Sequence, residues 1–247
     1  MPRTQSPEHV PENTLRKLAR MLTLAERDEP VTPDTGDLQS VHPHPPVLGV
    51  TGPPGAGKST LISLIIRRLR AQGETVAVLA IDPSSPRHGG ALLGDRIRMQ
   101  AHAGDAGVYI RSLASQGASG GLAPGMGNML TILAEAGFQN LIIETVGVGQ
   151  DAVEIKNWAD ICMLVLTPAA GDGIQTMKAG IIEIASMIVV NQAETGAEKL
   201  RQDLIESLPA GHSPGIYSSV ATEPEGATAV LDDVLQHLQA IRRKRNL

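Results

Sequence analysis

Residues 49–69 read GVTGPPGAGKSTLISLIIRRL and decide the fold, because an apolar run, a glycine-rich loop and a helical pattern follow one another directly. Within this stretch, Gly52, Gly57, Lys58 and Ser59 form the pattern Gly-x-x-x-x-Gly-Lys-Ser. Glycines let backbone amides converge on phosphates in conformations that a Cβ would block, and the helix dipole attracts the same anion. An ordinary glycine-rich turn is the alternative, but it does not account for strand, eight-residue pattern and helix occurring together. The residues predicted to bind a nucleotide here are Gly52, Pro54, Gly55, Ala56, Gly57, Lys58, Ser59 and Thr60.

The loop also assigns chemistry to individual side chains. Lys58 is expected to reach the β- and γ-phosphates, and Ser59 has the hydroxyl that ligates magnesium. Thr60 is positioned to touch the α-phosphate. The pattern therefore predicts binding of a nucleoside triphosphate with magnesium.

Three carboxylates are candidates for the same magnesium ion. Asp82 ends the apolar run 76–82, Asp95 lies in the following segment, and Glu144 ends the run 141–144. A hard cation held mainly by phosphate oxygens and water needs one or two direct carboxylates, with others behind them. A helix cap or turn is the alternative role, most of all for Asp82 and Asp95. We predict Ser59, Asp82, Asp95 and Glu144 as the metal-binding set.

A glycine three residues after Glu144 is typical of a switch that senses the γ-phosphate. Gly147 is expected to donate its amide to that phosphate. Gln150 and Thr145 are candidates for orienting the attacking water, and a polar neighbour without that role is the alternative. Lys58, Glu144 and Gln150 are the predicted catalytic residues.

Short apolar runs alternate with helical stretches along most of the chain. This alternation predicts an α/β fold with a doubly wound, mostly parallel sheet, in which ligands bind beyond the carboxyl ends of the strands. Residues 13–27 have the spacing of an amphipathic helix, and residues 28–46 have no periodicity. We expect an N-terminal helix and linker over 1–46 and a nucleotide-binding domain over 47–247. The predicted strands are 47–50, 76–81, 108–110, 141–143, 161–166, 188–190 and 215–217.

Composition excludes several classes of function. A net charge of -5 over 247 residues and 2% aromatic content offer neither a basic field nor stacking platforms for nucleic acid. No apolar run reaches the roughly 18 residues of a membrane span, and the polar N-terminus lacks a signal-peptide core. We expect a cytoplasmic protein without disulfides, since Cys162 stands alone in an apolar run.

Five motifs together resemble a known family. GVTGPPGAGKSTL, VAVLAIDPSSP, GGALLGDRIRM, ETVGVGQ and AAGDGIQTMKAGIIEIA, in this order and spacing, are similar to the GTPase chaperones of adenosylcobalamin-dependent acyl-CoA mutases. That family includes the methylmalonyl-CoA mutase-associated GTPases, within the metallochaperone-like P-loop proteins. The resemblance spans about residues 14–243 and implies binding of GTP or GDP with Mg²⁺ and a cobalamin-dependent acyl-CoA mutase as partner. It also implies that Asp82, Asp95 and Glu144 serve magnesium and hydrolysis, and that residues 171–178 form a switch facing the mutase.

Three departures from the family pattern affect what the resemblance implies. The base-reading motif Asn-Lys-Ala-Asp is replaced by Asn-Gln-Ala-Glu at 191–194. A carboxylate can still accept two hydrogen bonds from guanine, so we expect GTP to be favoured modestly, with adenine or low discrimination left open. The switch reads GDGIQTMKAG where relatives have GDELQGIKKG. We also expect the family's usual C-terminal dimerisation arm to be missing, which leaves a monomer or a homodimer formed in another way. Asn191, Glu194 and Ser219 complete the predicted nucleotide-binding set.

Histidines and basic residues elsewhere in the chain have simpler interpretations. His42 and His44 lack a further convergent metal ligand, which favours a solvated loop and weakens a nickel metallochaperone. The RRKR sequence at 242–245 is interpreted as a solvated helix end, and Arg111 as one of several arginines able to reach the γ-phosphate only after rearrangement. The sequence thus favours a magnesium-dependent GTPase that chaperones a mutase. A P-loop small-molecule kinase and a weakly hydrolysing nucleotide-binding scaffold are the alternatives.

Overall fold

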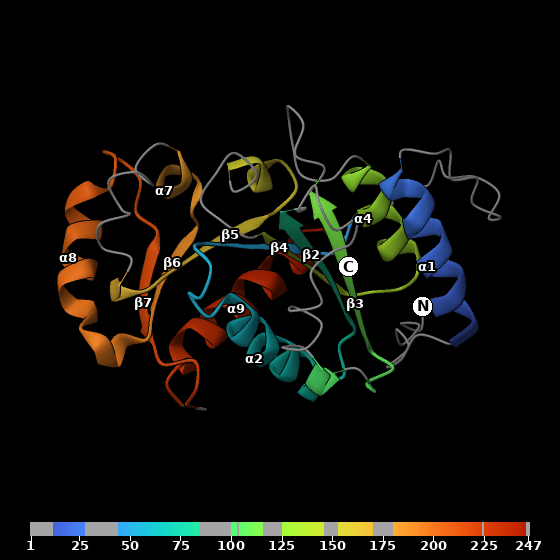
Figure 1. The fold of residues 1–247 in the computed structure, drawn as a ribbon, viewed down its shortest axis with the longest axis horizontal. Helices are drawn as coiled ribbons and strands as arrows, with labels where there is room; N and C mark the ends of the chain where they lie inside the picture. Colours follow the sequence, from blue (N-terminus) through green and yellow to red (C-terminus); the bar gives the residue numbers. More distant parts are fainter. Residues whose placement is uncertain are drawn as a thin grey trace.

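The computed structural model describes residues 12–27, 44–83, 100–102, 104–115, 125–145, 153–169, 180–223 and 225–245. Its centre is a seven-stranded sheet in the order β3-β2-β4-β1-β5-β6-β7, in which every neighbouring pair is parallel (Figure 1). The strands are β1 Val47–Thr51, β2 Val76–Pro83, β3 Val108–Ser115, β4 Asn140–Thr145, β5 Ile161–Leu166, β6 Met187–Asn191 and β7 Gly215–Ser219. Each predicted strand lies within one of these, and the predicted α/β fold with a parallel sheet is confirmed.

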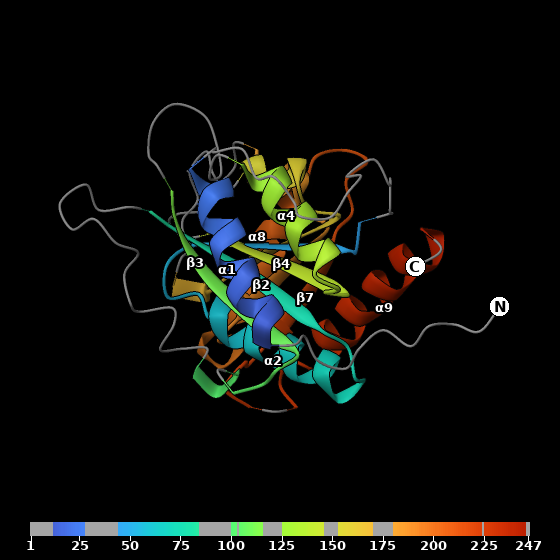
Figure 2. The same ribbon diagram turned by 90° about the vertical axis from the view of Figure 1, so that its right-hand side faces the viewer.

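Helices cover both faces of the sheet (Figures 1 and 2). The helices are α1 Glu12–Glu26, α2 Lys58–Ala71, α4 Met126–Glu135, α7 Ile181–Ile184, α8 Ala197–Ser207 and α9 Thr228–Lys244. Short 3₁₀ turns are η1 Gln100–His102, η2 Ile155–Asn157 and η4 Ala193–Thr195. Alternate side chains of β1 point to opposite layers: Leu48 and Val50 pack with α2 and α9, whereas Val47 packs with α1 and α4. Strands buried on both faces explain the near-continuous apolar runs of the sequence.

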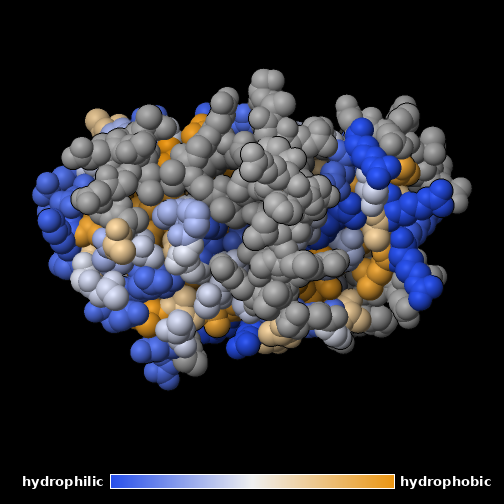
Figure 3. Space-filling model, in the orientation of Figure 1, coloured by the Kyte–Doolittle hydropathy of each residue, from blue (hydrophilic) through white to orange (hydrophobic). Residues whose placement is uncertain are grey.

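Helix α1 is part of the packed structure. Leu18, Leu22 and Ala25 are buried in the same cluster as α4 and the strands β2 and β4. Its other face carries the exposed Arg16, Lys17 and Arg20, which fits the amphipathic pattern of the sequence. Figure 3 shows the hydrophilic surface that gathers over this flank of the molecule. Among the described helices, none is long and apolar enough to cross a membrane.

Arg111 fastens α1 to the edge strand β3. Its guanidinium donates to the Ala19 carbonyl at 3.1 Å, to the Thr23 hydroxyl at 3.1 Å and to the Glu26 carboxylate at 2.7 Å. An arginine held by three partners in this way is not available for a phosphate. For Arg111 to reach the γ-phosphate after rearrangement, these three bonds would have to break.

The basic end of α9 is anchored at the amino edge of the sheet. Arg242 donates to both Glu74 carboxylate oxygens, at 2.7 and 3.0 Å, and to the Asn140 side-chain oxygen at 2.9 Å. Burial of Glu74 raises its pKa, but the hydrogen bonds from Arg242 and Asn140 outweigh that effect and hold the pKa below its ordinary value. Arg245 pairs with Asp160. The interpretation of 242–245 as a solvated helix end is thus wrong for these two arginines, because each crosses to a carboxylate at the start of a strand.

Candidate functional site

The predicted nucleotide-binding residues gather at the carboxyl edge of the sheet. All seven strands are parallel, so their carboxyl ends share one edge. The glycine-rich loop follows β1, Glu144 lies near the end of β4, and Asn191 and Ser219 end β6 and β7. Ligands of open α/β sheets bind at this edge.

Three glycines shape the loop between β1 and α2. Gly52, Gly55 and Gly57 have φ values of 142°, 77° and 89°, where an L side chain is strained. A Cβ at Gly52 would overlap the Val165 carbonyl of β5, and one at Gly57 would overlap the Asn191 side-chain amide. The loop can therefore lie against β5 and β6 only because these positions lack side chains.

The start of α2 is built to hold an anion. Gly57 precedes the helix without a side-chain cap, and the first turn has no acidic residue, so no carboxylate opposes the positive end of the helix dipole. Lys58 is 5% exposed, and its Nζ donates to the carbonyls of Gly52 and Pro53 at 3.0 Å each. Those two bonds fold the lysine back along the loop, which places its charge among the loop backbone. Pro54 and Thr60 are exposed at the outer side.

Ser59 and Glu144 meet in the interior. The Ser59 hydroxyl donates to Glu144 Oε1 at 2.9 Å, and the two residues are 5% and 1% exposed. A hydroxyl and a carboxylate are both hard oxygen groups, which suit Mg²⁺. The pair therefore fits a magnesium site at the start of α2.

The other predicted magnesium ligands are only partly described. The backbone of Asp82 lies in β2, which pairs with β4 up to Ile81 opposite Thr145. Asp82 thus follows the same sheet edge, one strand away from Glu144. Asp95, Gly147 and Gln150 lie outside the described residues.

Thr145 makes a contact that the sequence did not indicate. Its side chain is fully buried, and its hydroxyl donates to the Thr51 hydroxyl at 2.8 Å. A buried hydroxyl that already bonds a neighbouring strand is poorly placed to orient water. The alternative that the sequence left open, a polar neighbour without that role, is the one that fits Thr145.

Asn191 joins three parts of the site. Its Nδ2 donates to the Ala56 carbonyl of the loop at 2.9 Å, and its Oδ1 accepts from Ser219 Oγ at 2.9 Å and from the Ala221 amide at 3.0 Å. Asn191 is 3% exposed and Ser219 is 1% exposed. The structure therefore brings these two predicted residues into direct contact and adds the Ala221 amide, for which the sequence carries no signal.

The two altered positions of the base motif lie beside Asn191. Gln192 has a φ of 57°, which lies in the left-handed helical region that favours glycine. Its side-chain Nε2 lies 3.5 Å from the Gly55 carbonyl oxygen. Glu194 is exposed in η4. Gln192 is thus partly exposed beside the loop, and Glu194 is exposed two residues further along the chain.

We expect the double change Gln192→Lys with Glu194→Asp to widen the preference for GTP over ATP by about fivefold, because it restores the lysine stem and the shorter carboxylate. The ratio of the two dissociation constants, measured by calorimetry, checks this. Glu198→Asp, on the exposed side of α8, is a control for the carboxylate change. A ratio that stays at the wild-type value would show that these positions do not read the base.

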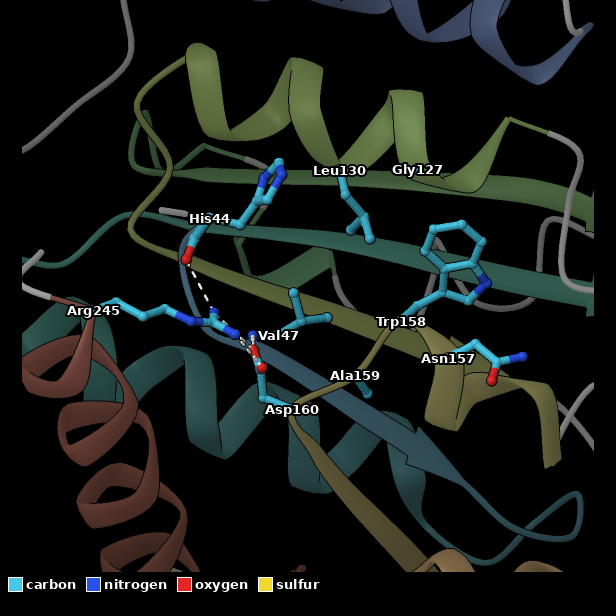
Figure 4. Close-up of a pocket in the computed structure, with 9 residues that line it drawn as sticks. All are labelled: His44, Val47, Gly127, Leu130, Asn157, Trp158, Ala159, Asp160 and Arg245. Atoms are coloured by element: carbon cyan, nitrogen blue, oxygen red, sulfur yellow. Dashed lines mark hydrogen bonds and ion pairs between the residues drawn. The ribbon is translucent and has the colours of Figure 1, made fainter. Parts of the chain in front are cut away.

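A separate cavity of about 290 Å³ lies at the opposite, amino edge of the sheet, lined by His44, Val47, Gly127, Leu130, Asn157, Trp158, Ala159, Asp160 and Arg245. Figure 4 shows Arg245 directed at Asp160 and at the His44 carbonyl. Asp160 also accepts from the Val47 amide at 2.9 Å. The charged side chains of this cavity, Arg245 and Asp160, thus form an ion pair with each other. This pair holds the end of α9 against the sheet.

Two further predictions concern cysteine and histidine. Burial raises the pKa of the Cys162 thiol to about 11, so the thiol stays protonated at neutral pH, as expected of a small buried hydrophobe. Within the part of the chain that the structure describes, no three His, Cys, Asp or Glu residues come together as a metal site. His42 lies outside the described residues, and His44 is exposed.

Comparison with known proteins shows to which family this chain belongs. The family model of the methylmalonyl-CoA mutase-associated GTPase MeaB matches residues 18–246. A protein of Pyrococcus abyssi named as a putative GTPase is 40% identical over 97% of this chain and 77% of its own length. The fused isobutyryl-CoA mutase of Paraburkholderia xenovorans is 40% identical over 78% of this chain and 17% of its own length.

A solved structure supports the fold. The crystal structure of a LAO/AO transport system kinase superposes with a TM-score of 0.63 and 24% identity, covering 96% of this chain and 82% of its own. At that identity the likeness concerns architecture alone. The family match and the relatives, together with the loop geometry, place this chain in the MeaB family of methylmalonyl-CoA mutase-associated GTPases.

Proposed function

We propose that this GTPase hydrolyses GTP to GDP with magnesium and acts as a chaperone of a cobalamin-dependent acyl-CoA mutase. The hydrolysis would be coupled to loading, protecting or reactivating the cofactor of that mutase. The observation that carries the hydrolytic half is the Ser59–Glu144 bond beside the glycine-rich loop. It joins the residue type that ligates magnesium in such loops to a strand-end carboxylate. A hydroxyl and a carboxylate in contact beside the loop support binding of a magnesium nucleotide, the form that is hydrolysed.

The chain's own residues can divide the work of phosphoryl transfer. Lys58 and the loop amides hold the β- and γ-phosphates, and Ser59 with Glu144, Asp82 and Asp95 supplies oxygen ligands around the cation. Bound Mg²⁺ would neutralise charge on the phosphate oxygens. Glu144 and Gln150 position the attacking water, and Gly147 contacts the γ-phosphate. Such chemistry depends mostly on positioning and charge stabilisation.

The base would lie over the carboxyl ends of β6 and β7. Asn191 links that region to the loop carbonyl of Ala56, so the base and phosphate contacts would be connected through one side chain. Glu194 is the acceptor for the guanine edge, and Ser219 holds the Asn191 amide in orientation. A carboxylate acceptor favours guanine over adenine because adenine presents a different donor pattern.

A mutase is the partner that the relatives suggest. The family is named for its association with methylmalonyl-CoA mutase, and one relative carries a similar segment within a fused isobutyryl-CoA mutase. Residues 171–178, the proposed contact with the mutase, lie outside the described residues. Fusion keeps two activities on one chain, which fits a working relationship between them.

We expect phosphate release by the isolated protein to be slow and to become severalfold faster when a cobalamin-dependent acyl-CoA mutase is added. Arg111 is committed to α1, so a cationic group near the γ-phosphate has to come from elsewhere, and a partner can order or supply one. Coupling is reciprocal in binding, so mutase affinity should differ between GDP and a non-hydrolysable GTP analogue.

Steady-state phosphate release and titration of a panel of purified mutases measure both effects. Equal rates and equal affinities across the panel would defeat the chaperone role. Detection of a phosphorylated metabolite instead of free phosphate would favour the kinase alternative.

A further inference from the structure

We infer that Thr51 and Thr145 are positioning residues that hold Glu144 against Ser59, and that magnesium-dependent hydrolysis depends on the bond between their hydroxyls. The inference rests on the proposed role of the Ser59–Glu144 pair. It concerns two residues to which neither the loop pattern nor the switch pattern assigns this task.

The first support is where the strand pairing stops. Backbone pairing between β1 and β4 runs from Val47 opposite Leu141 to Val50 opposite Glu144. Glu144 is thus the last residue of β4 in register with the strand that carries the phosphate loop. Thr145 still pairs with Ile81 of β2 and Thr51 with Leu164 of β5, so it is the pairing between β1 and β4 that ends here. The Thr145–Thr51 bond of 2.8 Å links the two strands one residue beyond that end.

The second support is the alternation of side chains. Leu48, Val50 and Ile142 belong to the layer of α2, while Val47, Leu141 and Ile143 belong to the layer of α4. Glu144 therefore reaches Ser59 of α2 on one face, and Thr145 meets Thr51 on the other. The end of β4 is held from both sides, so a shift of Thr145 would move the Glu144 carboxylate relative to Ser59.

The third support is the environment of the bond. Thr51 is 1% exposed and Thr145 is 0% exposed. Water cannot easily replace a hydroxyl partner there, and a buried hydroxyl left without one is costly. The bond is therefore well suited to keep the two strand ends at one fixed spacing.

Other contacts also tie the segment between β4 and β5 to β1. Gly49 has no side chain, and a Cβ there would come within 2.7 Å of the Ile155 side chain, so Ile155 of η2 packs directly onto β1. The Val47 amide donates to Asp160 at 2.9 Å. Ile155 and Asp160, which precede β5, thus both contact β1. The Thr51–Thr145 bond joins β1 to the carboxyl end of β4.

The test uses three variants: Thr145→Val, Thr145→Ser, and a double variant that combines Thr51→Val and Thr145→Val. Each is compared with the wild type. We expect Thr145→Val to lower kcat about fivefold and to raise by a similar factor the Mg²⁺ concentration needed for half-maximal hydrolysis. GDP affinity without magnesium should stay within about twofold, because the loop itself is intact. Thr145→Ser keeps the hydroxyl and should behave as the wild type.

The double variant separates positioning from packing. In the double variant, two apolar groups of similar shape replace both hydroxyls, so its melting temperature should recover toward the wild-type value while kcat and the magnesium requirement stay altered. Recovery of all three would overturn the inference, as would a Thr145→Ser variant that fails like Thr145→Val. Calorimetry of GDP with and without Mg²⁺ gives a readout that does not need turnover.

Failure of the proposed function is distinguishable from failure of this inference. A wild-type protein that neither hydrolyses GTP nor binds GDP more tightly with Mg²⁺ would refute the magnesium site itself, and the inference with it. An active wild type with an equally active Thr145→Val variant would refute the inference alone. The single tryptophan, Trp158, reports whether the η2 region keeps its wild-type environment in each variant.

Discussion

Replacing Lys58 with alanine is expected to weaken GTP binding by roughly ten- to a hundredfold, because a buried charge-assisted contact contributes about 1.5 to 3 kcal/mol. Lys58 is 5% exposed and its ammonium lies against the carbonyls of Gly52 and Pro53. The prediction assumes that the ammonium exchanges these carbonyls for the β- and γ-phosphates when a nucleotide binds. Calorimetric titration with a non-hydrolysable GTP analogue measures the loss.

The fold should survive the Lys58→Ala change. Its two hydrogen bonds are to loop carbonyls next to solvent-exposed positions, and the helix that follows is buried through Leu61, Ile62 and Ile65. Lys199→Ala on the exposed side of α8 is the matched control and should bind as the wild type. If Lys58→Ala binds the GTP analogue as tightly as the wild type and has the same melting temperature, the loop is not the phosphate-binding site.

Changing Glu144 to glutamine is expected to lower kcat by roughly 10- to 100-fold, the range found when a group that orients a metal ligand is removed. Glutamine keeps the size and can still accept from Ser59, so the effect isolates the charge. GDP affinity in the absence of magnesium should change little, since Glu144 meets Ser59 and not the loop carbonyls. Phosphate release as a function of Mg²⁺ concentration checks both parts.

Ser59 variants complete the Glu144 experiment. Ser59→Ala removes the hydroxyl and should raise the magnesium requirement, whereas Ser59→Thr keeps a hydroxyl and should retain most activity. Glu135→Gln, exposed at the end of α4, is a control for loss of a carboxylate elsewhere. A Glu144→Gln variant with wild-type kcat and wild-type magnesium dependence would show that this carboxylate has no part in hydrolysis.

Several features could be predicted from the sequence because their causes are local. The glycines at 52, 55 and 57 and the lysine and serine that follow are required by the backbone geometry of the loop itself. The central strands β1, β4, β5 and β6 are buried on both faces, so each appears as a mostly apolar run regardless of its neighbours. Glu144 and Asn191 were found because each ends such a run, and parallel strands bring their ends to one edge.

Contacts between distant residues could not be predicted in this way. The bond of Thr145 to Thr51 spans 94 residues, and that of Asn191 to the Ala56 carbonyl spans 135. Nothing in the local pattern of either residue indicates its partner, because a hydroxyl or an amide bonds whatever group the fold brings near. The same reason explains why the sequence does not indicate the partners of Arg111 on α1 or of Arg242 at Glu74. The sequence by itself determined the loop, the strands and the types of residue at their ends, whereas only the tertiary structure decided which of those side chains meet, because strand order and register set their distances.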